Sequence, residues 1–167
     1  MKRRPEILAP AGDEHSIQAA LTAGADAVYF GLEGSYNARA KSIGVARDQL
    51  SAVVRRCHYA GVRAYVTLNT LIFESELEEV TELIIECAQA GVDALIVQDP
   101  SVALIARYIA PTLEVHASTQ MTISSPEGAV FAQALGATRA VVPRELSLSQ
   151  IQRFARQSSI ELEVFIH

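Results

Sequence analysis

The sequence predicts an α/β protein with a parallel sheet, because a unit of helix, tight turn and buried strand recurs along its 167 residues. Related phrases carry the repeat: AGADAVYFG at 23–31, AGVRAYVTLN at 60–69, AGVDALIVQD at 90–99 and LGATRAVVPREL at 135–146. In each phrase a helical pattern ends at a glycine, which readily adopts the left-handed conformation that closes a helix. The apolar run that follows is continuous, and such runs are typical of parallel strands covered on both faces.

Taken in order, the apolar runs predict about seven strands, and the segments between them predict about six helices. The strands are expected at residues 6–9, 27–31, 63–69, 94–98, 113–116, 139–142 and 162–166. The second and third helices have inward apolar stripes at helical spacing, formed by Leu50, Val53, Val54 and Cys57 and by Leu77, Val80, Ile84 and Cys87. Helix starts are indicated by Asp13, Asp99 and Ser147 as N-caps, and by Ser125 before Pro126.

The spacing of these units favours a TIM-barrel-like (β/α) fold over a doubly wound dinucleotide-binding fold, which is the alternative. Each unit takes roughly 30 to 45 residues, and no glycine-rich phosphate fingerprint follows the first strand. A closed barrel of this type has eight strands, so about seven strands would leave two sheet edges unpaired. We therefore expect an incomplete barrel whose open edges could support self-association.

Composition narrows the class of protein. Hydrophobic residues make up 50% of the chain, which is ample for one core, and the sequence contains no apolar run of membrane-spanning length. A cytoplasmic protein without membrane contact is expected. The formal charge of -5 excludes a broad positive field for nucleic acid, so contact with RNA would need a local patch. The acidic run at 74–86 is interpreted as a solvated helix face.

Neither a zinc site nor a serine nucleophile is indicated. The four histidines are scattered without an HExxH pattern, and Ser118 lacks a G-x-S-x-G elbow. Cys57 and Cys87 form no CxxC pair and lie on the inward helix stripes, which favours buried, inert thiols over ligands or nucleophiles.

Polar residues gather where the predicted strands end, which is the edge that carries the active site in (β/α) barrels. His116 and Glu145 are the candidate catalytic residues, His116 to orient substrate or move a proton. The candidate substrate-binding residues are Asn37, Arg39, Asn69, Ser118, Gln120 and Arg144. The two arginines suit a carboxylate or phosphate. Local roles are the alternative: Asn69 satisfying loop backbone, Arg144 pairing with Glu145, and His116 being structural.

Several phrases in order resemble the N-terminal region of a known family. They are EILAPAGD, GADAVYFGL, NARA, YVTLNTLIF, GVDALIVQDP, EVHASTQMTI, PRELSL and ELEVFIH, and they span nearly the whole chain. The family is that of the collagenase-like peptidases, peptidases of unknown catalytic type numbered thirty-two. Within it, NTLIF and HASTQMTI most resemble the branch that hydroxylates a cytidine of 23S ribosomal RNA.

The resemblance implies a 4Fe-4S protein that performs oxygen-independent, prephenate-linked hydroxylation of an RNA base. Other members act on a ubiquinone precursor, and a collagen-degrading activity is ascribed to some relatives. The family signature E-x-F-x-x-G-[SA]-x-C begins at Glu163 and Phe165 and extends to His167, where the sequence ends before the cysteines. The cluster ligands are therefore absent from this chain, and no cofactor is expected for residues 1–167 alone.

The leading hypothesis is that residues 1–167 form a single partial barrel domain, the N-terminal fragment of a longer family member. It would bind RNA or a small carboxylate for a hydroxylase and would be inactive alone. A second hypothesis is a collagenase-like peptidase in which His116 and carboxylates bind a metal or activate water. A ubiquinone-precursor hydroxylation component and an inactive scaffold are further alternatives.

Overall fold

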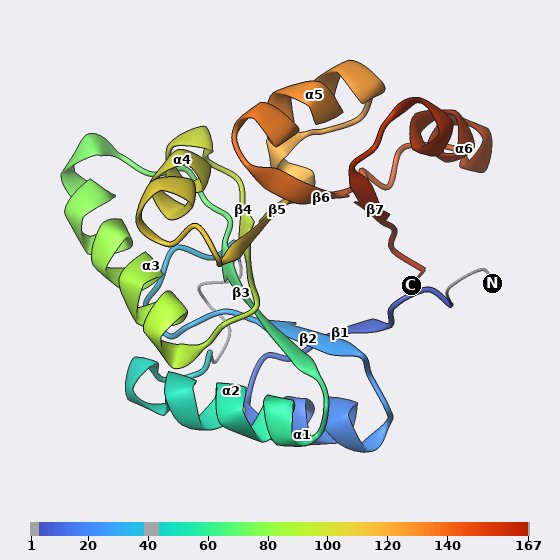
Figure 1. The fold of residues 1–167 in the computed structure, drawn as a ribbon. Coiled ribbons are helices and arrows are strands. Elements are labelled where there is room, and N and C mark those ends of the chain that lie inside the picture. Colours follow the sequence, from blue (N-terminus) through green and yellow to red (C-terminus); the bar gives the residue numbers. More distant parts are fainter. Residues whose placement is uncertain (1–3, 39–43, 167) are drawn as a thin grey trace.

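The computed structural model describes residues 4–38 and 44–166, which form a curved parallel sheet with helices packed on its outer side (Figure 1). The strands are β1 (Leu8–Pro10), β2 (Ala27–Phe30), β3 (Arg63–Leu68), β4 (Ala94–Val97), β5 (Glu114–Ala117), β6 (Ala137–Val141) and β7 (Glu161–Glu163). The α-helices are α1 (Glu14–Thr22), α2 (Leu50–Tyr59), α3 (Leu77–Ala90), α4 (Pro100–Ile109), α5 (Pro126–Ala134) and α6 (Leu148–Gln157). Short 3-10 turns occupy Arg47–Gln49, Glu74–Glu76 and Thr119–Met121.

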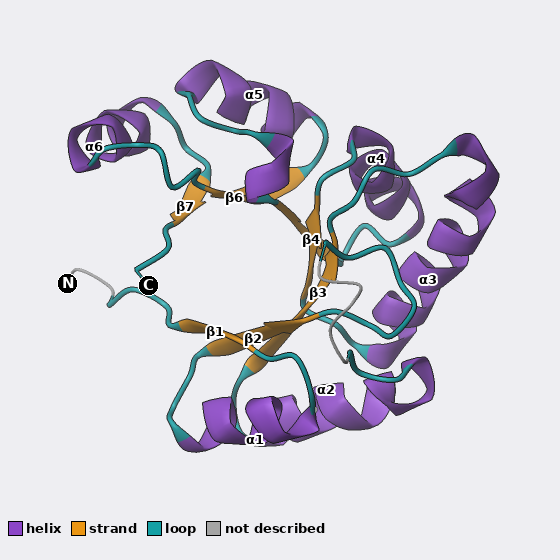
Figure 2. Ribbon diagram, turned by 180° about the vertical axis from the view of Figure 1, so that it is seen from behind, coloured by secondary structure: helices purple, strands orange, loops and turns teal. Residues whose placement is uncertain are grey.

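The strands pair in chain order from β1 to β7, and neighbouring strands run parallel. The sheet therefore curls into a partial barrel, with β1 and β7 on either side of an opening (Figure 2). The TIM-barrel-like prediction is confirmed. The strand bounds differ from the predicted ones by one or two residues at most ends, and the difference matters most at β5, which continues through Ala117.

Capping residues set the helix starts as predicted. Asp13 Oδ1 accepts the Ser16 N–H at 2.7 Å, and Asp99 Oδ1 accepts the Ser101 N–H at 2.8 Å. These side chains satisfy backbone donors that have no partner inside the helix. Gly91 ends α3 in the left-handed conformation at φ 80°, which a residue with a Cβ rarely adopts.

The main core lies between the outer face of the sheet and the helices. Alternate strand residues such as Val66 and Leu95 point outward into it, where they meet the helix stripes. Cys57 and Cys87 are fully buried in this core, as predicted. The inner face of the sheet carries a separate small cluster of Ala27, Tyr65, Ala94 and Ile96, together with the polar groups that form the site.

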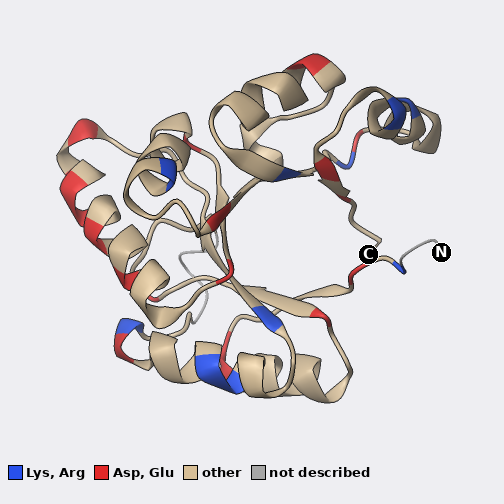
Figure 3. Ribbon diagram, viewed as in Figure 1, with Lys and Arg blue, Asp and Glu red and all other residues tan. Residues whose placement is uncertain are grey.

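The acidic run on α3 is a solvated face, as predicted. Glu78, Glu79 and Glu82 are exposed, and Figure 3 shows acidic residues spaced along this outer helix. Arg47 forms a bidentate ion pair with Glu86 at 2.7 and 3.0 Å, which neutralises part of the run. Within the part of the chain that the structure describes, no helix combines the length and apolar character needed to cross a bilayer.

Candidate functional site

A cavity of about 460 Å³ opens at the carboxyl ends of the strands. Its volume lies within the range typical of small-molecule sites. Backbone and side chains from loops after β1, β2, β3, β5 and β6 surround it, as the barrel topology dictates. The lining residues are Pro10, Ala11, Gly12, Tyr29, Phe30, Gly31, Asn37, Ala38, Gly44, Thr67, Asn69, Ile96, Ser118, Thr119, Gln120, Val141, Pro143, Arg144, Glu145, Glu163 and Phe165.

Six of the eight predicted site residues meet at this cavity: Asn37, Asn69, Ser118, Gln120, Arg144 and Glu145. They come from segments as far apart as residues 37 and 145, so the fold brings them together as the strand-end argument predicted. Arg39 lies outside the described residues. The roles proposed for the six residues remain predictions.

Asn69 links two walls of the cavity. Its Oδ1 accepts the Ala38 N–H at 3.0 Å, and its Nδ2 lies 3.5 Å from Ser118 Oγ as a donor. Ser118 Oγ in turn accepts the Gln120 N–H at 3.3 Å, which fixes the turn after β5. The loop after β2 and the loop after β5 are thus held at a common point, so a change at Asn69 would move both walls.

Asn37 is held close to the backbone of its own loop. Its Nδ2 donates to the Leu32 carbonyl at 3.2 Å, and the side chain is largely buried. A Cβ placed on Gly31 would lie 2.7 Å from Asn37 Cγ, a distance that real Cβ contacts essentially never show. The bare backbone at Gly31 is therefore what gives Asn37 its place in the cavity wall.

The Arg144 side chain packs against an aromatic ring at the rim of the cavity. Its guanidinium carbon lies 4.3 Å from the centroid of the Phe165 ring, a cation–π contact. Both residues line the cavity, so the described part of the site offers a stacked cation beside amides, hydroxyls and the carboxylates of Glu145 and Glu163. Such a rim can hold an anionic or ring-shaped ligand.

The expectation that His116 lies at the mouth is wrong. Because β5 runs on through Ala117, His116 sits inside the strand, and its side chain points into the barrel one layer below Ser118. It is 0% exposed and does not line the cavity. Burial, with Arg139 and Arg63 nearby, lowers the pKa of His116 to about 3, so the ring is neutral. Its Nε2 lies 3.2 Å from Glu114 Oε2, and Tyr65 packs against it edge to face at 4.9 Å.

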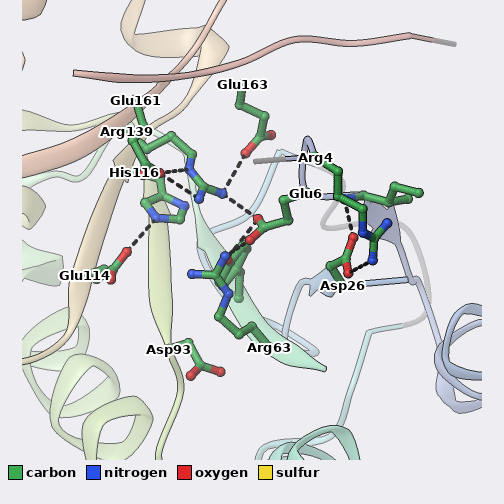
Figure 4. Close-up of polar contacts among 12 residues, drawn as sticks. Arg4, Glu6, Asp26, Arg63, Asp93, Glu114, His116, Arg139, Glu161 and Glu163 are labelled. Carbon is green, nitrogen blue, oxygen red and sulfur yellow. Dashed lines mark hydrogen bonds and ion pairs between the residues drawn. The ribbon is translucent and has the colours of Figure 1, made fainter. Parts of the chain in front are cut away.

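A charged cluster fills the barrel interior beside His116 (Figure 4). At its centre Arg139 of β6 contacts Glu6 at 2.7 Å and Glu161 at 2.9 Å, and lies 3.7 Å from Glu163. Glu6 also pairs with Arg63 and accepts the Tyr65 hydroxyl at 3.1 Å. Opposite charges so close offset the cost of removing each from water.

Glu163 is a charged cavity residue that was not among the predicted site residues. It is the last residue of β7 and faces the barrel interior, where it lines the cavity and approaches Arg139. Burial raises the pKa of the Glu163 carboxyl, while Arg139 lowers it in part. A usable signal was present: Glu161 and Glu163 alternate along the final strand, which places both on one face of the sheet.

The described residues do not fit a 4Fe-4S cluster. Such a cluster is held by cysteine thiolates, usually four. Cys57 and Cys87 are buried in the outer core, away from the cavity lining, and burial raises the pKa of Cys87 to about 12. Across residues 4–38 and 44–166, no cluster of three or more His, Cys, Asp or Glu is placed to hold a metal ion.

Comparison with known proteins places this geometry in a family. The family model described as Peptidase family U32 matches residues 12–167. The chain is 40% identical over 164 residues to the 23S rRNA 5-hydroxycytidine C2501 synthase of Escherichia coli K12, covering 98% of this chain and 24% of the relative. It is 36% identical over 148 residues to a collagenase of Porphyromonas gingivalis, covering 88% of this chain and 35% of the relative.

A solved structure agrees on the fold. The U32 peptidase Mk0906 superposes with a TM-score of 0.76 at 14% identity, covering 98% of this chain and 70% of that one. The chain itself spans 24% and 35% of the length of the two curated relatives. Because the family model matches residues 12–167, nearly the whole sequence, the chain belongs to peptidase family U32.

Proposed function

We propose that this chain forms the substrate-binding part of an oxygen-independent RNA base hydroxylase. The observation that carries the proposal is the convergence of Asn37, Asn69, Ser118, Gln120 and Arg144 on one cavity at the strand ends. The identity of 40% to a 23S rRNA 5-hydroxycytidine synthase, over nearly all of this chain, supports an RNA base as the substrate.

The cavity has the chemistry that recognition of an unstacked base requires. Proteins read single-stranded bases by hydrogen bonds to their edges and by stacking on aromatic or guanidinium planes. The amides and hydroxyls of Asn69, Ser118 and Gln120 supply both donors and acceptors, and the Arg144–Phe165 stack supplies a flat surface. Arg144 would also attract a phosphate or carboxylate despite the net charge of -5.

The 4Fe-4S cluster and the use of prephenate enter this proposal through the family resemblance only. Because the described residues provide no set of thiolate ligands, any cluster must be held by other residues. We therefore assign the chain binding and orientation of the substrate, and no redox step.

A peptidase is the second candidate, favoured by the collagenase relative at 36% identity. It would need a histidine or carboxylate to activate water or hold a metal at the cavity. His116 lies below the cavity and does not line it, so it does not join the carboxylates of Glu145 and Glu163 there. Among the described residues, no group of three or more His, Cys, Asp or Glu is placed to hold a metal ion. The geometry of the described residues thus supports binding of a base better than hydrolysis of a peptide.

The test is to delete the gene and analyse the nucleosides of ribosomal and transfer RNA by mass spectrometry. One hydroxylated base should disappear in the deletion strain and return with the wild-type gene. Asn69→Ala should restore about tenfold less, since losing a hydrogen bond of about 1.4 kcal/mol changes a rate by about that factor. Gln133→Ala, which removes an exposed amide bonded to Ser159, is the matched control and should restore fully.

Two results would reject the proposal. The first is an identical nucleoside profile in the deletion and wild-type strains. The second is cleavage of gelatin by the intact protein, if Asn69→Ala abolishes this cleavage. Loss of the hydroxylated base without any gelatinase activity would reject the peptidase.

A further inference from the structure

We propose that Glu163 contacts the substrate directly, its carboxylate accepting a hydrogen bond from an N–H or O–H group of the bound base or nucleoside. This inference rests on the proposed function and assigns a role to a residue that the strand-end argument did not select. It names a substrate-contacting residue within the cavity and the chemistry of the group that it recognises.

The first support is an unsatisfied oxygen beside the cavity. Glu163 lines the cavity, yet its Oε2 is buried and has no hydrogen-bond partner within residues 4–38 and 44–166. Arg139 Nη1 lies 3.7 Å from Oε2, too far for a hydrogen bond. A buried carboxylate oxygen without a donor is unfavourable, and a donor on a bound ligand would remove that penalty.

The second support is that Arg139 uses its hydrogen bonds on carboxylates other than Glu163. It contacts Glu6 Oε1 at 2.7 Å through Nη1, and Glu161 Oε2 at 2.9 Å through Nη2 and 3.3 Å through Nε (Figure 4). The guanidinium is thereby fixed by two other carboxylates. Arg139 therefore acts on the Glu163 carboxylate through its charge at 3.7 Å, and the hydrogen-bonding capacity of that carboxylate is left partly unused by the described residues.

The third support is the contrast with Glu161 on the same strand. Glu161 lies two residues earlier, pairs with the same arginine and is 68% exposed, but it does not line the cavity. The two glutamates thus share a strand and a partner, and they differ in side-chain exposure, 68% against 18%, and in contact with the cavity. Glu161 is consequently a matched control for any general effect of removing a carboxylate next to Arg139.

Protonation gives the proposal a specific signature. Burial raises the pKa of Glu163, so its carboxylate form is lost at a higher pH than for an ordinary glutamate as the medium is acidified. Only the carboxylate accepts freely at both oxygens. The charged and titratable groups around it are Arg139, Glu6, Arg63, Tyr65, His116 and Glu161 in the barrel, and Arg144 and Glu145 at the cavity.

The experiment compares Glu163→Gln with Glu161→Gln in the intact enzyme acting on RNA isolated from the deletion strain. Glu163→Gln should lower kcat/KM at least tenfold and remove the acid limb of the pH profile. Glu161→Gln should stay within twofold of wild type and keep that limb. Equal losses in the two variants, or a Glu163→Gln enzyme within twofold of wild type, would overturn the assignment. Wild-type enzyme that hydroxylates no RNA would instead overturn the proposed function and this inference with it.

A second measurement on wild-type protein covers the case in which Glu163→Gln does not fold. Carboxyl groups are coupled to an amine with a carbodiimide, with and without the undermodified RNA, and labelling is mapped by peptide mass spectrometry. Bound RNA should reduce labelling at Glu163 several-fold and leave Glu161 unchanged. Unchanged labelling at Glu163 under saturating RNA contradicts the contact.

Discussion

Glu6 and Arg139 lie 133 residues apart in the sequence and form an ion pair of 2.7 Å inside the barrel. Glu6 precedes β1 and Arg139 lies in β6, so the pair joins the two sides of the opening between β1 and β7 (Figure 2). Strand pairing does not cross that opening in the described sheet, whose order runs from β1 to β7. At this opening the two sides of the sheet are therefore linked by an ion pair between side chains, whereas neighbouring strands elsewhere in the sheet are linked by backbone hydrogen bonds.

Replacing Arg139 by methionine should destabilise the protein strongly. The Arg139 side chain is only 9% exposed, and its loss leaves Glu6, Glu161 and Glu163 without their shared cation. Removing one partner of a buried pair costs about 3 to 5 kcal/mol in the free energy of unfolding. Urea unfolding followed by circular dichroism measures that change.

Arg4→Met is the control for this substitution. Arg4 also ties the segment before β1 to the barrel, through Asp26 at 2.5 Å, but its side chain is 69% exposed. Its loss should cost about 0 to 1 kcal/mol. Similar losses for the two variants would show that burial of the Arg139 cluster adds nothing to stability.

The buried His116 should make stability depend on acid pH. Its pKa is lowered from 6.5 to about 3 in the fold, so between these values the unfolded chain binds a proton that the folded chain does not. The free energy of unfolding should therefore fall as pH drops from about 6.5 towards 3, by up to about 1.4 kcal/mol per pH unit from this group.

His116→Gln isolates the contribution of the imidazole. The difference in slope between wild type and variant should appear in unfolding experiments below pH 6.5 and vanish above pH 7.5, where the ring is neutral in both states. Superimposable slopes throughout would mean that the ring protonates in the native protein. Nitrogen chemical shifts of the His116 ring at pH 5 give the same answer directly, since a neutral ring is expected.

The two thiols should be inert in the native protein. Cys57 and Cys87 are fully buried, and burial raises the pKa of both groups, that of Cys87 to about 12. Because thiolates are the reactive species, Ellman's reagent should label neither residue under native conditions and both in denaturant. A Cys57→Ala, Cys87→Ala double variant should restore RNA hydroxylation in the deletion strain. Loss of the modification with the fold intact would indicate that these thiols serve the cofactor.

The fold could be predicted because its signals are local. A glycine such as Gly91, with φ 80°, closes a helix, and the apolar run that follows forms a strand. Both assignments use neighbouring residues only and need no knowledge of contacts with distant parts of the sequence. The same local argument placed Asn69 and Ser118 at the cavity. It failed for His116 because a one-residue extension of β5 decides whether that side chain faces the mouth or the barrel interior. It also missed the contact between Glu6 and Arg139, which depends on curvature of the whole sheet.

Gly31 should be a position where one methyl group alters the cavity without breaking the fold. A Cβ there would lie 2.7 Å from both Asn37 Cγ and Asn37 Nδ2, so Gly31→Ala must displace that side chain from the cavity wall. Gly31 is not among the glycines with a positive φ, so the strain of the substitution comes from this contact and not from a left-handed backbone. RNA hydroxylation should fall about tenfold, with a modest loss of stability of about 1 to 3 kcal/mol for overpacking.

Gly128→Ala provides the comparison that separates this effect from a general sensitivity to added methyl groups. Gly128 lies in the first turn of α5, where a Cβ would meet Ile123 Cγ2 at an ordinary 3.7 Å. Alanine favours helix over glycine by up to about 1 kcal/mol, so this variant should be as stable as wild type or slightly more stable. Its hydroxylation activity should be unchanged, because α5 contributes no residue to the cavity. If Gly31→Ala were as active as Gly128→Ala, the position of Asn37 would not matter to the reaction, and Asn37 would have to be removed from the substrate-binding residues.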